Sequence, residues 1–329
     1  MSAKPIAMRD ALLRRIHDAM ATDKSIFFVS ADFGSPVLDR IRADFPERFV
    51  NVGIAEQNLI NVSAGLALEG YTVFAYAIAP FITMRCFEQI RVSLALLSTV
   101  RPMNLNLIGV GAGYSYVVSG PTHQCYEDIT LMRALPNFQV LSPADHVAAA
   151  ALFDQCVGVL GPKYLRLDAQ VLAAIYADGI APNLKDGFNV HRRESGICLV
   201  ATGYMLHTAF IVADRLSRLG LEIGVIDLFD LARFSAEKLR TELMRYQTVV
   251  SMEEGFAGRG GVDALLGDFI RRTALDVKLI GIGVEGGYRF DLGTRAELHE
   301  QVGIGPDVIT QRLLDLSNGR GKAASGARR

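Results

Sequence analysis

Apolar runs and amphipathic stretches alternate along the whole chain. Short apolar runs rich in β-branched and aromatic residues predict buried strands, and apolar residues three or four positions apart predict helices. In the first half the pattern predicts helices at residues 5–21, 54–69, 84–98, 126–134 and 145–158, and strands at 25–32, 48–52, 71–77, 103–110, 138–143 and 163–167. Strands that alternate with helices of this length favour right-handed crossovers and a mostly parallel sheet that is covered on both faces.

A second series follows a stretch of weak periodicity at residues 170–192, where Pro, Gly and charges indicate a linker. Strands are then expected at 197–203, 222–229, 248–254 and 277–283, and helices at 205–219, 235–245, 261–273 and 294–302. We therefore predict an α/β protein with two doubly wound domains, a mostly parallel one over residues 1–186 and a smaller one over 187–316, followed by a disordered basic tail over 317–329.

Composition narrows the possible classes of function. The 329 residues carry 34 Lys and Arg against 35 Asp and Glu, so the overall charge does not favour binding to nucleic acid or to an anionic membrane. No apolar run is long enough for a membrane span, and the charged, amphipathic start differs from a signal peptide, which favours a cytoplasmic protein. The four widely spaced cysteines have no metal-ligand spacing and are expected to be reduced thiols.

The glycine-rich segment "GVGAGYS" at residues 109–115 is incomplete as a dinucleotide-binding fingerprint. Tyr114 takes the place of the last glycine, and the β-rich stretch that follows does not favour a helix. This segment is expected to form a loop over a site.

Three further segments carry most of the functional information: "NVGIAEQNLINVSAGLA", "APFITMRCFEQIR" and "SGPTHQCYEDITLMRALPNFQVLSPAD". Together they resemble the pyrimidine-binding half of the transketolase family, a group of thiamine diphosphate enzymes that includes the 1-deoxyxylulose-5-phosphate synthases. The second domain, with "ATG" at 201–203 and "EEG" at 253–255, resembles the family's C-terminal domain. The resemblance covers residues 5–315 and implies an enzyme that transfers a two-carbon ketol unit between sugars or sugar phosphates.

The resemblance gives Glu56 a catalytic role. In the family, the matching carboxyl hydrogen-bonds a ring nitrogen of the cofactor's aminopyrimidine, and it must be partly desolvated to share a proton at neutral pH. By position alone, Glu56 is better explained as a first-turn acid favoured by the helix dipole, and the flanking motif reverses this interpretation.

Two residues of the second segment are candidates for the same site. Phe81 matches an aromatic residue that stacks on the pyrimidine ring, although it also fits an ordinary core position. Arg85 matches an arginine at the substrate site of the deoxyxylulose-phosphate synthases, although a structural or solvated arginine is an alternative.

The remaining candidates belong to the predicted substrate channel. His123 in "SGPTHQ" matches the family histidine that hydrogen-bonds the donor carbonyl or hydroxyl and moves a proton, the alternative being a structural histidine. Arg166, near the end of a predicted strand, matches an arginine that binds the phosphate of a sugar phosphate.

The sequence departs from the family pattern at two places in this channel. Ser119 stands four residues before His123, where transketolases have an aspartate that contacts a donor hydroxyl. A phosphate-binding histidine or arginine of the family falls near Gly111 and Ala112. The resemblance therefore implies that Ser119 lies at the substrate and that the substrate has an unusual shape or charge.

The sequence contains no Gly-Asp-Gly, the family's mark of the half that holds the diphosphate and its divalent metal. The resemblance therefore implies that thiamine diphosphate and Mg²⁺, or a similar ion, are held mainly by a separate diphosphate-binding subunit. This chain is expected to form a homodimer within an α2β2 assembly.

Three other functions are alternatives to ketol transfer. The first is a decarboxylating condensation of a 2-oxo acid with an aldehyde, as in the deoxyxylulose-phosphate synthases, which Arg85 favours. The second is the β-subunit of a 2-oxo acid dehydrogenase, which "GPTHQ" argues against. The third is a binding protein that kept the fold without the chemistry.

Overall fold

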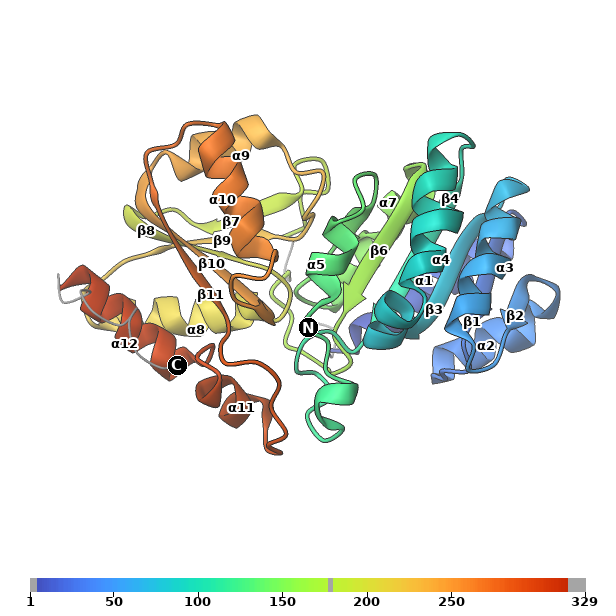
Figure 1. The fold of residues 1–329 in the computed structure, drawn as a ribbon, viewed down its shortest axis with the longest axis horizontal. Coiled ribbons are helices and arrows are strands. Elements are labelled where there is room, and N and C mark those ends of the chain that lie inside the picture. The colour runs from blue at the N-terminus through green and yellow to red at the C-terminus, as the bar shows by residue number, and fades with distance from the viewer. Residues whose placement is uncertain (1–4, 177–179, 319–329) are drawn as a thin grey trace.

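The computed structural model describes residues 5–176 and 180–318, and it contains two α/β bodies that lie side by side (Figure 1). The first body is built on a parallel sheet with the strand order β2-β1-β3-β4-β6-β5. Its strands are β1 (Ile26–Ser30), β2 (Phe49–Asn51), β3 (Thr72–Ile78), β4 (Asn104–Val110), β5 (Gln139–Leu141) and β6 (Gly161–Leu167). This topology confirms the mostly parallel sheet predicted for the first half of the chain.

Helices cover both faces of this sheet, because its strands are apolar on both sides. The core of one face is completed by α1 (Met8–Thr22), α2 (Pro36–Asp44), α6 (His146–Ala151) and α7 (Phe153–Gly158). The other face carries α3 (Glu56–Leu68), the π-helical segments η2 (Phe81–Arg85) and η3 (Ile90–Leu96), α4 (Phe87–Gln89) and α5 (Asp128–Arg133). Short 3₁₀ turns complete this body: η1 (Pro46–Arg48), η4 (Leu97–Thr99) and η5 (Gly120–Thr122).

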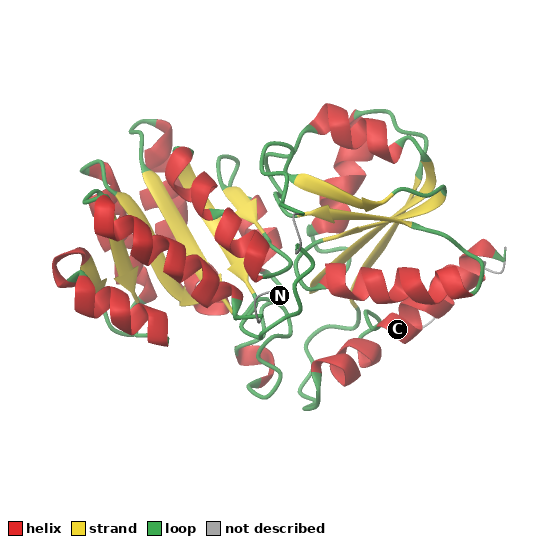
Figure 2. Ribbon diagram, turned by 180° about the vertical axis from the view of Figure 1, so that it is seen from behind, coloured by secondary structure: helices red, strands yellow, loops and turns green. Residues whose placement is uncertain are grey.

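The second body has a mixed sheet with the order β11-β10-β8-β9-β7, in which only β7 runs antiparallel to its neighbour. Its strands are β7 (Phe188–Arg192), β8 (Gly196–Ala201), β9 (Gly224–Leu228), β10 (Tyr246–Phe256) and β11 (Lys278–Val284). The helices α8 (Met205–Arg218), α11 (Arg295–Gln301) and α12 (Pro306–Ser317) pack on one face, and α9 (Ala236–Leu243) and α10 (Val262–Arg272) on the other (Figure 2).

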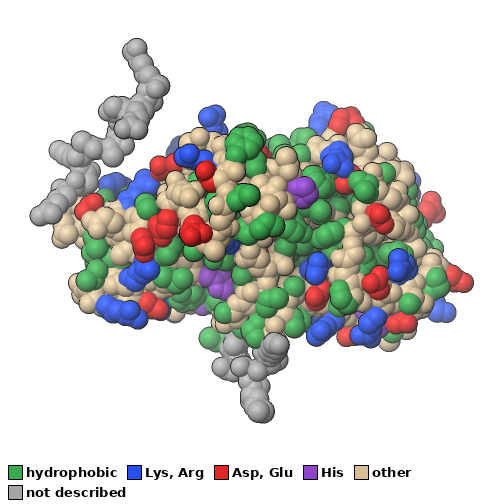
Figure 3. Space-filling view, turned by 90° about the horizontal axis from the view of Figure 1, so that it is seen from below, with side chains coloured by type: hydrophobic (Ala, Val, Ile, Leu, Met, Phe, Trp, Pro, Cys, Tyr) green, Lys and Arg blue, Asp and Glu red, His purple; other side chains and the backbone are tan. Residues whose placement is uncertain are grey.

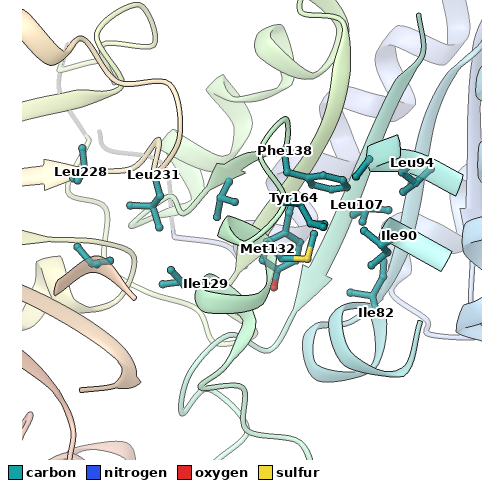
Figure 4. Close-up of a cluster of buried hydrophobic side chains, with 14 of the residues drawn as sticks. Ile82, Ile90, Leu94, Leu107, Ile129, Met132, Phe138, Tyr164, Leu228 and Leu231 are labelled. Carbon is teal, nitrogen blue, oxygen red and sulfur yellow. The ribbon is translucent and has the colours of Figure 1, made fainter. Parts of the chain in front are cut away.

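One apolar core runs from the first sheet into the second body. Ile129 and Met132 of α5 belong to the same buried cluster as Tyr164 of β6 and as Leu228 and Leu231 from the second body (Figure 4). Helix α5 therefore holds the two bodies together, and it also follows directly after the segment that contains His123.

Three elements were missed by the sequence pattern. Helix α2 lies where only a turn was expected, although Ser35 accepts a hydrogen bond from Leu38 N at 3.2 Å and Pro36 fills the first helical position. Strand β7 was assigned to the linker because it is an edge strand with little buried surface. Helix α12 begins at Pro306, and only Ile309 and Leu313 are fully buried.

Two predicted helices are interrupted. The segment predicted as one helix over residues 84–98 consists of π-helical, α-helical and 3₁₀ turns, and residues 145–158 form α6 and α7 instead of one helix. The predicted basic tail lies outside the described residues, apart from residues 317–318.

The parallel register decides where the loops meet. Ser30 of β1 lies beside Asn51 of β2 and Tyr76 of β3, and Val110 of β4 lies beside Ile78 and Leu167. The carboxyl ends of these strands therefore form one edge, which is where open α/β sheets bind ligands.

Candidate functional site

Glu56 is the first residue of α3 and follows shortly after Asn51, the last residue of β2. Its side chain is only 3% exposed, although the helix start would allow it to project into water. The N-terminal end of the helix favours a negative charge there. A buried carboxylate nevertheless needs a partner, because burial removes its hydration.

That partner is Arg85, whose Nη1 donates to Glu56 Oε2 at 2.7 Å. The Arg85 side chain is 46% exposed, so the ion pair joins a buried carboxylate to a guanidinium that reaches the surface. Arg85 ends the π-helical turn η2, which begins with Phe81, and its guanidinium carbon lies 4.5 Å from the centre of the Phe81 ring. A planar cation thus fills the space between Glu56 and Phe81.

His123 reaches the same place from the other side. It directly follows the 3₁₀ turn η5, and its Nδ1 lies 3.0 Å from Thr122 Oγ1. The imidazole meets Phe81 edge to face, with ring centres 5.2 Å apart and planes at 68°. The structure therefore brings Glu56, Arg85, Phe81 and His123 into one continuous cluster.

Tyr116 also belongs to this cluster and was missed by the sequence pattern. Its ring centre lies 6.3 Å from that of His123, with the planes at 82°. Nothing in the spacing marked it, because it lies in an irregular loop between the glycine-rich segment and Ser119. Ser119 itself is exposed, and its N–H donates to Tyr116 O at 3.3 Å, so both residues share one turn near His123.

Arg166 lies elsewhere. Its side chain is 2% exposed, and Nε donates to Asp128 Oδ2 at 2.8 Å, the same oxygen that accepts from Tyr164. Arg166 Nη2 is also buried, and it has no hydrogen-bond partner among the described residues. The structure thus places Arg166 in a buried ion pair with a residue of α5, and its phosphate-binding role stays a prediction.

A second polar cluster, the interdomain network of Asp168, Glu254, Arg295 and His299, joins the two bodies. Arg295 lies 2.6 Å from Asp168 and 2.7 Å from Glu254, and His299 Nε2 lies 2.7 Å from Glu254 Oε1. Burial opposes the charged form of Glu254, but Arg295 and His299 outweigh it and hold the pKa of Glu254 well below its usual value. Burial has the larger effect on Asp168 and raises its pKa. Sequence patterns do not predict this network, since its members come from separate elements.

Among residues 5–176 and 180–318, no three His, Cys, Asp or Glu side chains are grouped as a metal site. No helix in these ranges has the length and apolar character needed to cross a bilayer. All four cysteines are buried and unpaired, as expected for reduced thiols.

Comparisons with known proteins agree with this architecture. Residues 4–173 match the family model "Transketolase, pyrimidine binding domain", and residues 187–309 match "Transketolase, C-terminal domain". An apulose-4-phosphate transketolase subunit of Actinobacillus succinogenes is 32% identical over 277 residues, which cover 83% of this chain and 86% of that protein. The 6-deoxy-6-sulfo-D-fructose transketolase subunit SqwH of a Clostridium species is 28% identical over 252 residues, 75% of each chain.

Solved structures show the same fold. The structure titled "Split gene transketolase, inactive beta4 tetramer" matches with a TM-score of 0.81 and 28% identity, over 94% of this chain and 97% of that one. Transketolase from Campylobacter jejuni matches with a TM-score of 0.78 and 18% identity, over 95% of this chain but 47% of that one. This chain belongs to the transketolase family, and the resemblance seen in its sequence is confirmed.

Proposed function

We propose that this chain is the pyrimidine-binding subunit of a thiamine diphosphate-dependent transketolase and that a separate diphosphate-binding chain completes its active site. The observation that carries the proposal is the arrangement of Glu56, Arg85 and Phe81. The guanidinium of Arg85 is planar, donates an N–H to Glu56 and lies over an aromatic ring. An aminopyrimidine is also planar and nitrogen-rich, so it can use the same carboxylate and the same ring.

Glu56 fits a cofactor of this kind. Among the described residues, only its Oε2 has a hydrogen-bond partner, so Oε1 can bind a group from outside the chain. Bound thiamine diphosphate supplies the nucleophilic carbon for ketol transfer. Glu56 holds and shares a proton at the pyrimidine nitrogen, Phe81 orients the ring, and His123 exchanges a proton with an oxygen of the ketose.

Two features support the need for a second chain: a missing diphosphate-binding motif and exposed apolar residues beside the site. The sequence has no Gly-Asp-Gly, and two relatives that it matches over most of their length are themselves named as transketolase subunits. Ile54 and Met84 lie next to the site and are 75% and 39% exposed. On the face seen from below in Figure 3, hydrophobic side chains lie between the charged side chains of the two bodies. We propose that the partner covers this site, holds the diphosphate and the divalent metal, and forms an α2β2 complex with two copies of this chain.

The substrate class follows from the relatives and from the departures in the loop. The named relatives act on a phosphorylated and a sulfonated sugar, both of which carry an anionic end. Ser119 cannot supply the charge of an aspartate to a donor hydroxyl. We therefore propose a ketose with an anionic terminus as donor, a class to which the sugar phosphates used in the tests below belong.

Purification of the tagged chain from its natural cells tests the proposal. A diphosphate-binding chain with Gly-Asp-Gly should co-purify, and the complex should bind thiamine diphosphate and transfer a ketol unit from xylulose 5-phosphate to an aldehyde. Ile54→Asp should remove the partner, whereas Ile211→Asp, at an exposed residue of α8, should retain it. Stoichiometric binding of thiamine diphosphate by this chain alone, or a complex that binds it without any ketol transfer, would contradict the proposal. Release of carbon dioxide from pyruvate without ketol transfer would favour the synthase-type reaction.

A further inference from the structure

The loop over residues 111–119 leaves β4 at the edge of the sheet where the candidate site lies. Gly111 N and Ala112 N both donate to Leu167 O, at 2.9 and 3.1 Å, and Gly113 and Cys125 exchange two hydrogen bonds of 3.0 Å. The loop therefore turns back on itself instead of continuing as a helix. This turn places the Tyr116 ring beside His123.

Gly111 lies directly beneath that ring. It is buried and has a φ of +101°, and a Cβ built at this position would overlap the Tyr116 ring. No side chain fits at residue 111 while Tyr116 keeps its place. Tyr116 therefore occupies the volume into which a side chain at residue 111 would project.

The hydroxyl end of Tyr116 has a defined chemistry. Burial raises the pKa of Tyr116 to about 12, against the opposing effect of Arg9, so the phenol stays neutral at pH 7. A neutral phenol hydroxyl can donate one hydrogen bond and can also accept, but it cannot form an ion pair with a phosphate. The ring is nevertheless only partly buried, so it can meet a substrate bound at His123.

The second body holds this loop in place. Glu254 lies against Gly113, where a Cβ would overlap its side chain, and Glu254 Oε1 accepts from Tyr114 N at 3.4 Å. Arg295 and His299 in turn fix the Glu254 carboxylate. Tyr116 is thus positioned two residues beyond a backbone segment that the interdomain network anchors.

We propose that Tyr116 is a specificity-determining residue that limits the length of the ketose that reaches His123, an inference that rests on the function proposed above. The Tyr116 ring lies beside His123 and fills the volume that a side chain at residue 111 would occupy. A longer sugar chain must displace this ring, whereas a shorter one ends before it.

The test uses the complex with its partner chain and two ketol donors that differ by two carbons, xylulose 5-phosphate and sedoheptulose 7-phosphate, with one fixed acceptor. Tyr116→Val should raise the ratio of kcat/KM for the longer donor to that for the shorter by about tenfold, because it opens the space above Gly111. Tyr116→Phe keeps the ring and should leave the ratio within about twofold of the unsubstituted complex. Val118→Ala, at a 79% exposed residue of the same loop, is the matched control and should not change the ratio.

The two proposals fail in different ways. An equal fall in kcat/KM for both donors in Tyr116→Val, or the same change in ratio in Val118→Ala, overturns the role of Tyr116 alone. Absence of ketol transfer from both donors in the unsubstituted complex overturns the proposed function, and this inference with it.

Discussion

Two clusters in this molecule both pair an arginine with carboxylates, but one lies partly at the surface and the other is fully buried. The Glu56, Arg85, Phe81 and His123 cluster lies at the edge of the first sheet, where a buried carboxylate is paired with a half-exposed arginine. The interdomain network pairs Arg295 with two carboxylates, and all three side chains are at most 5% exposed. In the first cluster, Glu56 Oε1 can still accept a hydrogen bond from a group outside the chain. In the second cluster, the buried carboxylates are paired with Arg295 and His299 of the same chain. The difference separates residues that can bind a ligand from residues that hold the fold.

The largest expected effect is on catalysis. Glu56→Gln removes the proton that the carboxyl shares with the cofactor, and it should lower kcat of the complex by roughly 10²–10⁴-fold. Steady-state ketol transfer measures the loss, and thermal unfolding of the variant should be close to that of the unsubstituted chain. Glu69→Gln, at the exposed C-terminal end of the same helix, is the matched control. Unchanged turnover in Glu56→Gln would mean that Glu56 has no catalytic role and only pairs with Arg85.

Arg295→Met should affect stability most. It leaves Asp168 buried without its cation and Glu254 with His299 as its remaining ion-pair partner, which costs about 3–5 kcal/mol in free energy of unfolding. Urea unfolding measures this cost, and Arg312→Met, which breaks an exposed pair with Glu285, should cost less than about 1 kcal/mol. Equal effects of the two substitutions would show that the interdomain network does not join the bodies as described.

Glu253, the neighbour of Glu254 on β10, allows a test by pH. Burial, and then the charge of Asp263, raise the pKa of Glu253 from its ordinary 4.5 to about 7. Between these values the folded chain binds more protons than the unfolded chain, so this group makes the free energy of unfolding fall as pH rises from about 4.5 to 7. Glu253→Gln should remove this fall, about 3 kcal/mol at most, from urea titrations across the window. A slope that stays the same would place the titration on another group.

The smallest effect concerns Arg85. Arg85→Ala should increase the affinity of the complex for thiamine diphosphate several-fold, because the guanidinium no longer competes for Glu56 and Phe81. Calorimetric titration measures the affinity, and Arg91→Ala, at an exposed residue of the next turn, should leave it unchanged. A lower affinity in Arg85→Ala would mean that Arg85 binds the cofactor or holds Glu56 in place.

Much of the fold was predictable because alternation of apolar strands and amphipathic helices reports local burial. The pattern failed at α2 and α12, where few residues are fully buried, and at β7, an edge strand with one fully buried residue. It also predicted one regular helix where the π-helical turn η2 brings Phe81 and Arg85 to the site. Short-range periodicity does not distinguish an α-helical turn from a π-helical one.

The candidate site was predictable for a different reason. Glu56 and His123 stand in motifs whose local sequence marks them, and the structure brings both to one cluster. The burial of Arg166 was not predictable, because its ion-pair partner Asp128 lies 38 positions away. Tyr116 carried no motif, and its place depends on how the loop folds over Gly111.

The sequence by itself determined most of the order of strands and helices, the family, and the identity of the carboxylate and imidazole proposed for catalysis. Only the tertiary structure decided that Arg85 pairs with Glu56, that Arg166 is withdrawn from solvent and that Arg295 joins the two bodies. The physical reason is the distance along the chain over which each effect acts. Propensity and periodicity act over a few residues, whereas the ion pair between Glu56 and Arg85 joins positions 29 apart and the bond between Arg295 and Glu254 joins positions 41 apart.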